Sequence, residues 1–291
     1  MTPTHEHPSE GTDRTRLAPA LATATARLAA AGVASPRVDA ELLAAHALGV
    51  GRGRLLLIDT VRGAELGRFT ALVEQRARRI PLQHLLGTAA FRHLELAVGA
   101  GVFVPRPETE LLAGWGIEHT APGATVVDLC SGTGAIALSV ADEAAPGRVL
   151  AVERSPAALA YLRRNAEPFP VVRVVEGDVT DPRLLAECRG MVDVLLCNPP
   201  YVPDGTAVPP EVADHDPAEA VFGGADGLVV IRPVIGLAAA LLRPGGVVGI
   251  EHDDVHAAAV PELLRADGRF TAVVAHDDLT GRPRFATARR V

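Results

Sequence analysis

The stretch VVDLCSGTGAIAL, residues 126–138, decides how the second half of the chain folds. An apolar run ends at Asp128, a loop turns through Gly132 and Gly134, and an apolar helical pattern begins at once. Glycine accepts the left-handed backbone that so sharp a turn needs, and N–H groups at the start of a helix face whatever lies above the loop. The stretch therefore predicts a strand, a ligand-binding loop and a helix. Its D-x-x-x-G-x-G spacing differs from the dinucleotide and P-loop patterns, so phosphate is not the indicated ligand.

Strand and helix patterns alternate on both sides of this stretch, over residues 105–291. Strands are predicted at 125–129, 148–153, 171–178, 192–198 and 246–252, and helices between them at 135–144, 156–165, 182–188 and 227–242. Two further strands surround a Gly-Arg-Pro turn at 281–283. Such alternation indicates an α/β domain, with a mostly parallel sheet that carries helices on both faces and ends in an antiparallel hairpin.

The first part of the chain has a helical period instead. Apolar patterns predict helices at 17–31, 35–48 and 64–80, the second beginning with Ser35 and Pro36 and the third stopped by Pro81. We therefore expect a polar, disordered leader at 1–13 and a small helical domain at 14–86. Residues 87–104 change to a strand period, and we expect strands at 91–98 and 102–104 to form a hairpin that links the two domains.

The composition indicates the cellular compartment of the protein and excludes some types of reaction. The 291 residues are 48% hydrophobic and 22% charged, which fits a soluble globular protein. The three cysteines form no C-x-x-C pair, so neither a disulfide framework nor a cysteine zinc site is indicated. The N-terminus lacks a signal-peptide core and no apolar run reaches the roughly 18 residues of a membrane span. We expect a cytoplasmic protein that does not bind membranes, and the absence of lysine excludes Schiff-base chemistry.

Charge is divided unevenly along the chain. Residues 1–104 contain 12 arginines and nine acidic residues, a net charge of +3. Residues 105–291 have a net charge of −10, so the net charge of the whole chain is −7. A nucleic-acid enzyme needs cationic groups to neutralise phosphates. The negative α/β domain therefore argues against DNA or RNA as the direct substrate.

Polar side chains end the successive strands of the predicted sheet. Glu153 ends the second strand, where a carboxylate can accept both hydroxyls of a ribose, and Asp178 ends the third, where it can meet an adenine amino group. Each has a simpler alternative, as an acid that starts the following helix. Asn198 ends the fourth strand and begins Asn198-Pro199-Pro200-Tyr201. Ligands of open α/β sheets bind at these strand ends, so Asn198 should face the glycine loop.

The Asn-Pro-Pro-Tyr tetrapeptide suits the methylation of a planar nitrogen. An amide nitrogen is a weak nucleophile because its lone pair is delocalised, so it must be oriented. The side-chain oxygen of Asn198 and the carbonyl of Pro199 can accept its two N–H bonds, and proline adds no competing donor. We expect Tyr201 to pack on the planar substrate group. Catalysis would then depend on positioning and dipoles.

These strand ends together resemble the class I (Rossmann-like) S-adenosylmethionine-dependent methyltransferases. With FVPRPETELL at 103–112, the segment 211–227 and GIEH at 249–252, the chain resembles one family within that class, the release factor N5-glutamine methyltransferases (HemK/PrmC). The resemblance covers nearly the whole chain. It implies S-adenosylmethionine as cofactor, with the Phe-x-Pro-Arg-Pro loop helping to close its site.

The resemblance implies two groups of site residues. The catalytic group is the tetrapeptide Asn198, Pro199, Pro200 and Tyr201. The cofactor-binding group is Phe103, Arg106, Pro107, Asp128, Cys130, Ser131, Gly132, Thr133, Gly134, Glu153, Asp178, Val179 and Asn198. The sequence departs from the family where Cys130-Ser131 replaces the frequent Gly-Thr, where Glu153 replaces the commoner Asp, and where Val179 replaces an aromatic residue.

The implied reaction is methyl transfer from S-adenosylmethionine to the side-chain amide N5 of a glutamine, in the Gly-Gly-Gln motif of peptide chain release factors. The alternatives are methylation of a ribosomal-protein glutamine, adenine-N6 methylation of DNA, and a binding module without catalysis. The charge of −10 and the absence of a DNA-recognition domain oppose the DNA enzyme. The intact tetrapeptide opposes the binding module.

Two further groups have ordinary interpretations. The run EHDDVH, residues 251–256, contains metal-ligand types but leaves a strand and enters a helix, so we interpret it as a strand end with an acidic cap and expect no metal. Arg76, Arg78 and Arg79 are interpreted as a solvated helix face rather than a docking patch. The +3 helical domain is nevertheless the available surface for recognising a protein substrate.

Overall fold

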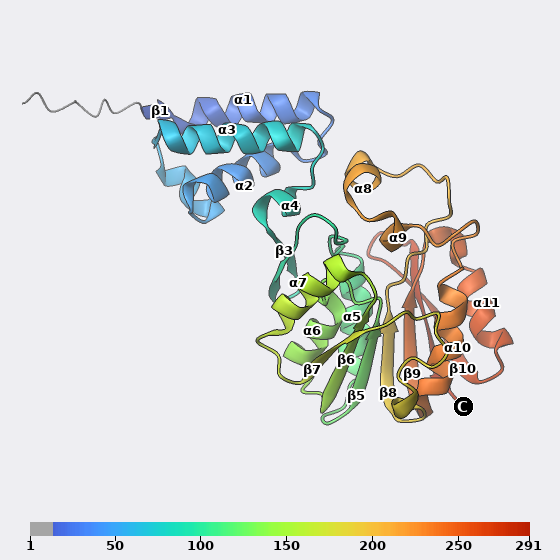
Figure 1. Ribbon diagram of the computed structural model, residues 1–291. Helices are drawn as coiled ribbons and strands as arrows, with labels where there is room; N and C mark the ends of the chain where they lie inside the picture. Colours follow the sequence, from blue (N-terminus) through green and yellow to red (C-terminus); the bar gives the residue numbers. More distant parts are fainter. Residues whose placement is uncertain (1–13) are drawn as a thin grey trace, which may run out of the picture. The chain divides into compact units, whose positions relative to one another are not determined.

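The structure is a computed structural model that describes residues 14–291 (Figure 1). The predicted leader, residues 1–13, lies outside the described residues. The chain divides into two compact units, with the boundary in the sequence between Leu86 and Gly87. None of the helices in the described range is long and apolar enough to cross a membrane.

Over residues 14–86, the first unit contains four α-helices: α1 (Leu17–Ala30), α2 (Pro36–Leu48), α3 (Gly63–Ala77) and α4 (Leu82–Leu86). A 3₁₀ helix at Arg52–Leu57 and a short ladder of β1 (Arg14–Arg16) with β2 (Thr60–Arg62) complete it. Leu28, Leu43 and Phe69 are buried in one hydrophobic cluster, which confirms the helical period. The sequence did not indicate the 3₁₀ helix, the ladder or α4.

Two expectations for the third helix were wrong. It ends at Ala77, before Pro81, because Arg79 takes a left-handed backbone with φ of 67°. Arg76 is not on a solvated face: it is 7% exposed, and its Nε donates to Asp39 at 2.7 Å. Arg78 is exposed. The three arginines therefore do not form one surface patch.

The second unit contains a seven-stranded sheet in the order β10-β11-β9-β8-β5-β6-β7 (Figure 1). The parallel strands are β5 (Thr125–Leu129), β6 (Arg148–Glu153), β7 (Val172–Glu176), β8 (Val192–Cys197) and β9 (Leu242–Glu251). The antiparallel edge consists of β10 (Phe270–Asp277) and β11 (Pro283–Arg290). The predicted α/β class and the closing hairpin are both confirmed.

Helices cover both faces of this sheet, as the alternating strands require. Val126 and its neighbours pack with α5 (Thr109–His119), α6 (Ala135–Glu143) and α7 (Pro156–Ala166). Val127 points to the opposite face, where α10 (Ile231–Leu241) and α11 (Ala259–Ala266) contribute. The short helices α8 (Pro210–His215) and α9 (Ala218–Val221) follow β8. The carboxyl ends of β5, β6, β7 and β8 are consequently brought to one edge.

The hairpin before the sheet lies elsewhere than predicted. Strands β3 (Thr88–Phe91) and β4 (Leu94–Ala97) turn at Arg92, whose φ is 50°, rather than at Gly99 and Gly101, and residues 102–104 form no strand. Phe91 is buried in a cluster of the second unit, so the hairpin belongs to that unit. The helix expected at 182–188 is also absent from the described residues there, which form turns and a 3₁₀ helix at Ala186–Cys188.

Candidate functional site

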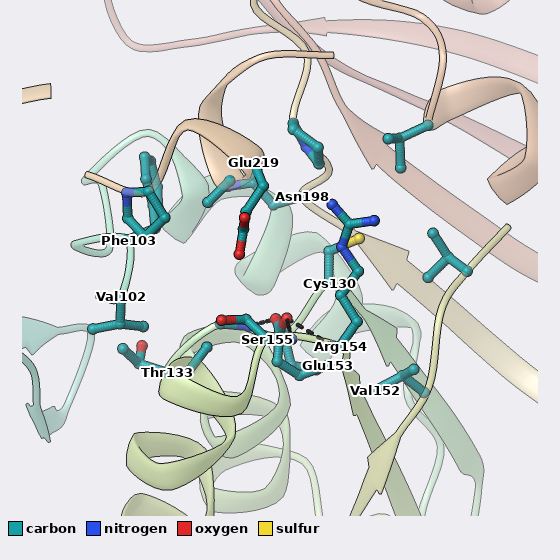
Figure 2. Close-up of a pocket in the computed structure, with 18 of the residues that line it drawn as sticks. Val102, Phe103, Cys130, Thr133, Val152, Glu153, Arg154, Ser155, Asn198 and Glu219 are labelled. Atoms are coloured by element: carbon teal, nitrogen blue, oxygen red, sulfur yellow. Dashed lines mark hydrogen bonds between the residues drawn. The ribbon is translucent and has the colours of Figure 1, made fainter. Parts of the chain in front are cut away.

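One pocket lies at the carboxyl ends of the parallel strands in the second unit (Figure 2). Ten of the residues singled out from the sequence line it: Phe103, Cys130, Ser131, Gly132, Thr133, Glu153, Asp178, Val179, Asn198 and Pro200. Six others do not: Arg106, Pro107, Asp128, Gly134, Pro199 and Tyr201. The pocket therefore gathers side chains from the ends of four strands, as the sheet topology requires.

The glycine loop adopts the strained turn that its sequence indicates. Cys130, Gly132 and Gly134 all have positive φ, of 58°, 57° and 91°. A Cβ on Gly132 would meet nothing within 4 Å, whereas a Cβ on Gly134 would lie 2.7 Å from the side chain of Leu162. Gly134 is thus required for packing against α7. Gly132 keeps the floor of the pocket open.

Asp128 supports this loop from behind. It is 1% exposed, its Oδ2 accepts the N–H of Ala137 at 3.1 Å, and Oδ1 has no hydrogen-bond partner among residues 14–291. Burial raises the pKa of its carboxyl to about 7. Because Asp128 joins the end of β5 to the first turn of α6, it acts on the pocket through the backbone.

Glu153 holds the loop from the neighbouring strand. Its Oε2 accepts the N–H of Gly132 at 2.8 Å, and its Oε1 accepts those of Arg154 and Ser155 at 2.8 and 2.9 Å. Figure 2 labels Glu153, Arg154 and Ser155 and marks hydrogen bonds between the residues drawn with dashed lines. A carboxylate has about four acceptor positions, so Glu153 retains capacity for ligand hydroxyls.

Asp178 and Val179 form the side of the pocket beyond β7. Asp178 Oδ1 accepts the N–H and the hydroxyl of Thr180 at 2.8 and 2.7 Å, and its Oδ2 lies 3.4 Å from Arg154 Nη1. The backbone hydrogen bond from Thr180 is the main cause that lowers the pKa of this carboxyl. Val179 is buried and supplies an apolar wall.

Asn198 has a fixed amide orientation. Its Nδ2 donates to Thr109 Oγ1, at the start of α5, at 3.0 Å. No donor in the described part of the chain bonds Oδ1 of Asn198. The side-chain oxygen is thereby left as the acceptor that this residue offers to a ligand.

The rest of the tetrapeptide is held by the following loop. Val202 donates to Val221 O at 3.0 Å and accepts from Gly223 N at 2.9 Å. A Cβ on Gly223 would lie 2.6 Å from the carbonyl of Pro200. Tyr201 does not offer its ring to the pocket, contrary to expectation. The ring packs against the core, and its hydroxyl donates to Glu251 Oε1 at 3.0 Å.

The Phe-x-Pro-Arg-Pro loop closes one side of the pocket with Phe103 rather than with its arginine. Arg106 pairs with Asp216, and its guanidinium lies 4.7 Å from the centre of the Phe103 ring. Pro217 and Glu219, next to Asp216, line the pocket, and Figure 2 shows Glu219 directed into it. The Arg106–Asp216 ion pair therefore connects the side of the pocket that contains Phe103 to the side that contains Pro217 and Glu219.

Three residues of this region were not assigned to the site from the sequence. Thr109 and Glu251 bond the tetrapeptide, and both lie within segments that resemble the family. Asn165 donates to the carbonyls of Thr133 and Ala97 at 3.0 and 3.1 Å, which joins the glycine loop to β4. No local pattern marks Asn165, which lies on an ordinary helix.

Residues 251–256 form the strand end with an acidic cap that the sequence indicates. Asp253 caps the 3₁₀ helix Asp254–His256 by accepting from Val255 N at 3.1 Å. Within residues 14–291, no cluster of His, Cys, Asp and Glu could hold a metal ion. The three cysteines of the chain are free thiols.

Comparison with known proteins gives matches over both units. Residues 19–87 match the family described as PrmC N-terminal domain, and residues 109–215 match the methyltransferase small domain. The release factor glutamine methyltransferase of Mycolicibacterium smegmatis is 57% identical over 278 residues, which is 95% of this chain and 99% of that protein. The protein of that name from Streptomyces coelicolor is 48% identical, covering 93% of this chain and 96% of its own length.

Solved structures confirm the fold. The T. thermophilus 16S rRNA N2 G1207 methyltransferase, solved with AdoMet and guanosine, aligns with 70% of this chain and 50% of its own, at a TM-score of 0.51 and 24% identity. At this identity, the likeness shows the architecture alone.

Proposed function

The chain belongs to the release factor glutamine methyltransferases, and we propose that its pocket performs methyl transfer from S-adenosylmethionine to the side-chain amide N5 of a glutamine. The substrate we propose is the Gly-Gly-Gln motif of peptide chain release factors, methylated in the cytoplasm. The observation that carries the proposal is the amide of Asn198, which lines the pocket, donates its Nδ2 to Thr109 and so offers its oxygen as an acceptor to a ligand.

The described residues fit this cofactor. The open space above Gly132 is a cradle that a side chain would fill. Glu153 would accept the ribose hydroxyls while it holds the loop, and Val179 with Asp178 would receive the adenine. Phe103 would cover the opposite side. These assignments are supported by the positions of the residues around one pocket.

The chain's own groups would orient the substrate. When bound, S-adenosylmethionine would supply an electrophilic methyl group on a positively charged sulfur. The glutamine amide nitrogen would lose one proton to water on accepting that methyl. Asn198 Oδ1 and the Pro199 carbonyl would accept the two N–H groups of the glutamine amide, which directs its lone pair. This contribution is positioning, and no covalent enzyme intermediate is needed.

We also propose a role for the first unit. One glutamine side chain offers too little contact to select a single amide in a proteome, so selectivity needs a larger surface. The first unit, residues 1–86, contains 11 arginines and eight acidic residues, a net charge of +3, and is the available surface. Direct nucleic-acid and membrane partners form no part of the proposal.

The test is incubation of the protein with purified release factors and methyl-labelled S-adenosylmethionine, followed by mass mapping. We expect one methyl on the glutamine of Gly-Gly-Gln, and none when that glutamine is replaced by asparagine. Ribosomal proteins and adenine-containing DNA are offered in parallel. If ribosomal proteins or DNA are labelled faster than the release factors, that molecule replaces them as the proposed substrate.

A further inference from the structure

An acidic side chain from the segment after the tetrapeptide points into the pocket. Glu219, on α9, lines the pocket, and Figure 2 shows its carboxylate directed into it, between Phe103 and Asn198. The residue is exposed to solvent, and no group within residues 14–291 forms a hydrogen bond or an ion pair with it. Its negative charge is therefore available to a ligand.

The short helix that carries Glu219 is held at both ends. At its end, Val221 O accepts from Val202 N at 3.0 Å, in the loop that follows the tetrapeptide. Just before its start, Asp216 pairs with Arg106 of the Phe-x-Pro-Arg-Pro loop. The helix is thus fixed between that loop and the tetrapeptide, so the carboxylate has a defined place in the pocket wall.

The other charged side chains of the pocket already have protein partners. Over the described chain, the pocket is lined by three carboxylates and one guanidinium: Glu153, Asp178, Glu219 and Arg154. Glu153 accepts three backbone N–H groups, while Asp178 accepts from Thr180 and pairs with Arg154. Glu219 is the carboxylate left without a contact of this kind. A pocket with this excess of negative charge favours a cationic ligand.

We propose that Glu219 is a specificity-determining residue, which makes the pocket prefer S-adenosylmethionine to S-adenosylhomocysteine, the product that methyl transfer leaves. The inference rests on the proposed function, which supplies this cofactor. The ribose and the adenine would occupy the Glu153 and Asp178 sides of the pocket. The space beside Asn198, into which Glu219 points, is then left for the methylated sulfur.

The two molecules differ at that sulfur by one methyl and one positive charge. The sulfur is a sulfonium in S-adenosylmethionine and a neutral thioether in S-adenosylhomocysteine, whereas both carry the same ammonium and carboxylate. A carboxylate near the sulfur therefore attracts only the first by a charge–charge interaction. Glu219 would favour release of the product and its replacement by fresh cofactor.

The experiment titrates both molecules into the full chain by calorimetry. Glu219→Gln keeps the shape of the side chain and removes its charge, so it should raise the Kd for S-adenosylmethionine fivefold or more and leave that for S-adenosylhomocysteine within twofold. Glu219→Asp keeps the charge and should retain at least half of the wild-type ratio of the two Kd values. Asp214→Asn removes a carboxylate of α8 that does not line the pocket, and as the matched control should leave both within twofold.

A third ligand separates the sulfonium from the shared ammonium. Sinefungin has a carbon bearing an ammonium group in place of the methylated sulfur, so Glu219→Gln should weaken its binding as it weakens that of S-adenosylmethionine. Equal weakening of all three ligands would place Glu219 against the shared ammonium and overturn the inference, as would an unchanged ratio of Kd values. Equal weakening with a lower melting temperature would assign a merely structural role.

The proposed function and this inference fail in different ways. If the wild type binds S-adenosylmethionine but methylates no release factor, the proposed substrate is wrong, and the ratio of Kd values still decides the role of Glu219. If the wild type binds none of the three ligands, both proposals are wrong. If it methylates release factors and Glu219→Gln leaves the ratio unchanged, only the inference is wrong.

Discussion

Arg106 donates to Asp216, a residue 110 positions further along the chain, and so connects the loop before α5 to the loop between α8 and α9. The Asp216 side chain is 1% exposed. Burial raises the pKa of this carboxyl, and the charge of Arg106 opposes that rise. Removing only the cation leaves a buried carboxyl without its ion partner, which costs more than removing both groups.

We therefore expect Arg106→Met to weaken S-adenosylmethionine binding about tenfold, or about 1.4 kcal/mol, because Pro217 and Glu219 beside Asp216 line the pocket. Asp216→Leu added to Arg106→Met should recover part of the affinity. Calorimetric titration measures both. Equal affinity of Arg106→Met and wild type would show that the ion pair does not hold the pocket wall.

Substitutions at Gly132 and Gly123 distinguish the effect of backbone strain from the effect of filling the space that the cofactor would occupy. Both have positive φ, 57° and 79°, and a Cβ on either would meet nothing within 4 Å. Only Gly132 lines the pocket. Valine at either position should cost comparable stability, about 1–2 kcal/mol for a left-handed residue, but only Gly132→Val should abolish cofactor binding. Thermal melts measure the stability of the two variants, and calorimetric titration measures their cofactor binding. If Gly132→Val still binds the cofactor, the glycine loop does not form part of the cofactor site.

Asp128 should make stability depend on pH. Its folded pKa of about 7 lies above the ordinary 3.8, so the folded state binds the proton more tightly. This contribution to stability is complete below pH 3.8 and is lost as the pH rises through about 7. The Asp128→Asn variant lacks this pH-dependent contribution. The difference in free energy of unfolding, variant minus wild type, should therefore increase between about pH 4 and 7, by roughly 1 kcal/mol per pH unit.

Urea unfolding of the two proteins at several pH values gives this difference directly. Other titrating groups cancel in the comparison, except for changes that the substitution itself induces. A difference that stays constant from pH 4 to 8 would mean that Asp128 is ionised at ordinary pKa in the folded protein.

Local patterns predicted the sheet and the strand ends at which the pocket lies, because strand, loop and helix signals are contained in short stretches. Residues 125–138 illustrate this, since their apolar period and glycines suffice for β5, the loop and the start of α6. The partners of the tetrapeptide were not predictable in this way. Thr109 and Glu251 reach it across 89 and 50 positions, and tertiary hydrogen bonds leave no periodic trace.

Two errors have identifiable physical causes. Gly99 suggested a hairpin turn, but its missing side chain serves packing, since a Cβ there would lie 2.3 Å from the Tyr161 hydroxyl. Arg76 suggested a solvated face, although it follows Val73 by three positions and Phe69 by seven on the buried side of α3. Helical spacing alone placed Arg76 inward, and Asp39 supplied the partner that makes a buried arginine tolerable.

The proposed docking role of the first unit is tested by fragment 87–291 and by two arginines. The fragment starts at Gly87 because β3 begins at Thr88, and it contains its own hydrophobic clusters, so we expect it to fold and bind S-adenosylmethionine. It should methylate intact release factor at least tenfold more slowly than the full chain, yet match it on a short peptide containing Gly-Gly-Gln.

Variants of Arg78 and Arg76 in the full chain distinguish a docking role of the first unit from a role in stability. Arg78 is exposed, so Arg78→Glu should give a smaller loss of methylation that shrinks at high salt, since salt screens surface charges. Arg76 pairs with buried Asp39, so Arg76→Met should instead lower stability, by about 3–5 kcal/mol, with no salt-dependent change in rate. If the fragment loses cofactor binding and thermal stability together, and Arg78→Glu is as fast as wild type at every salt concentration, the first unit only supports the fold.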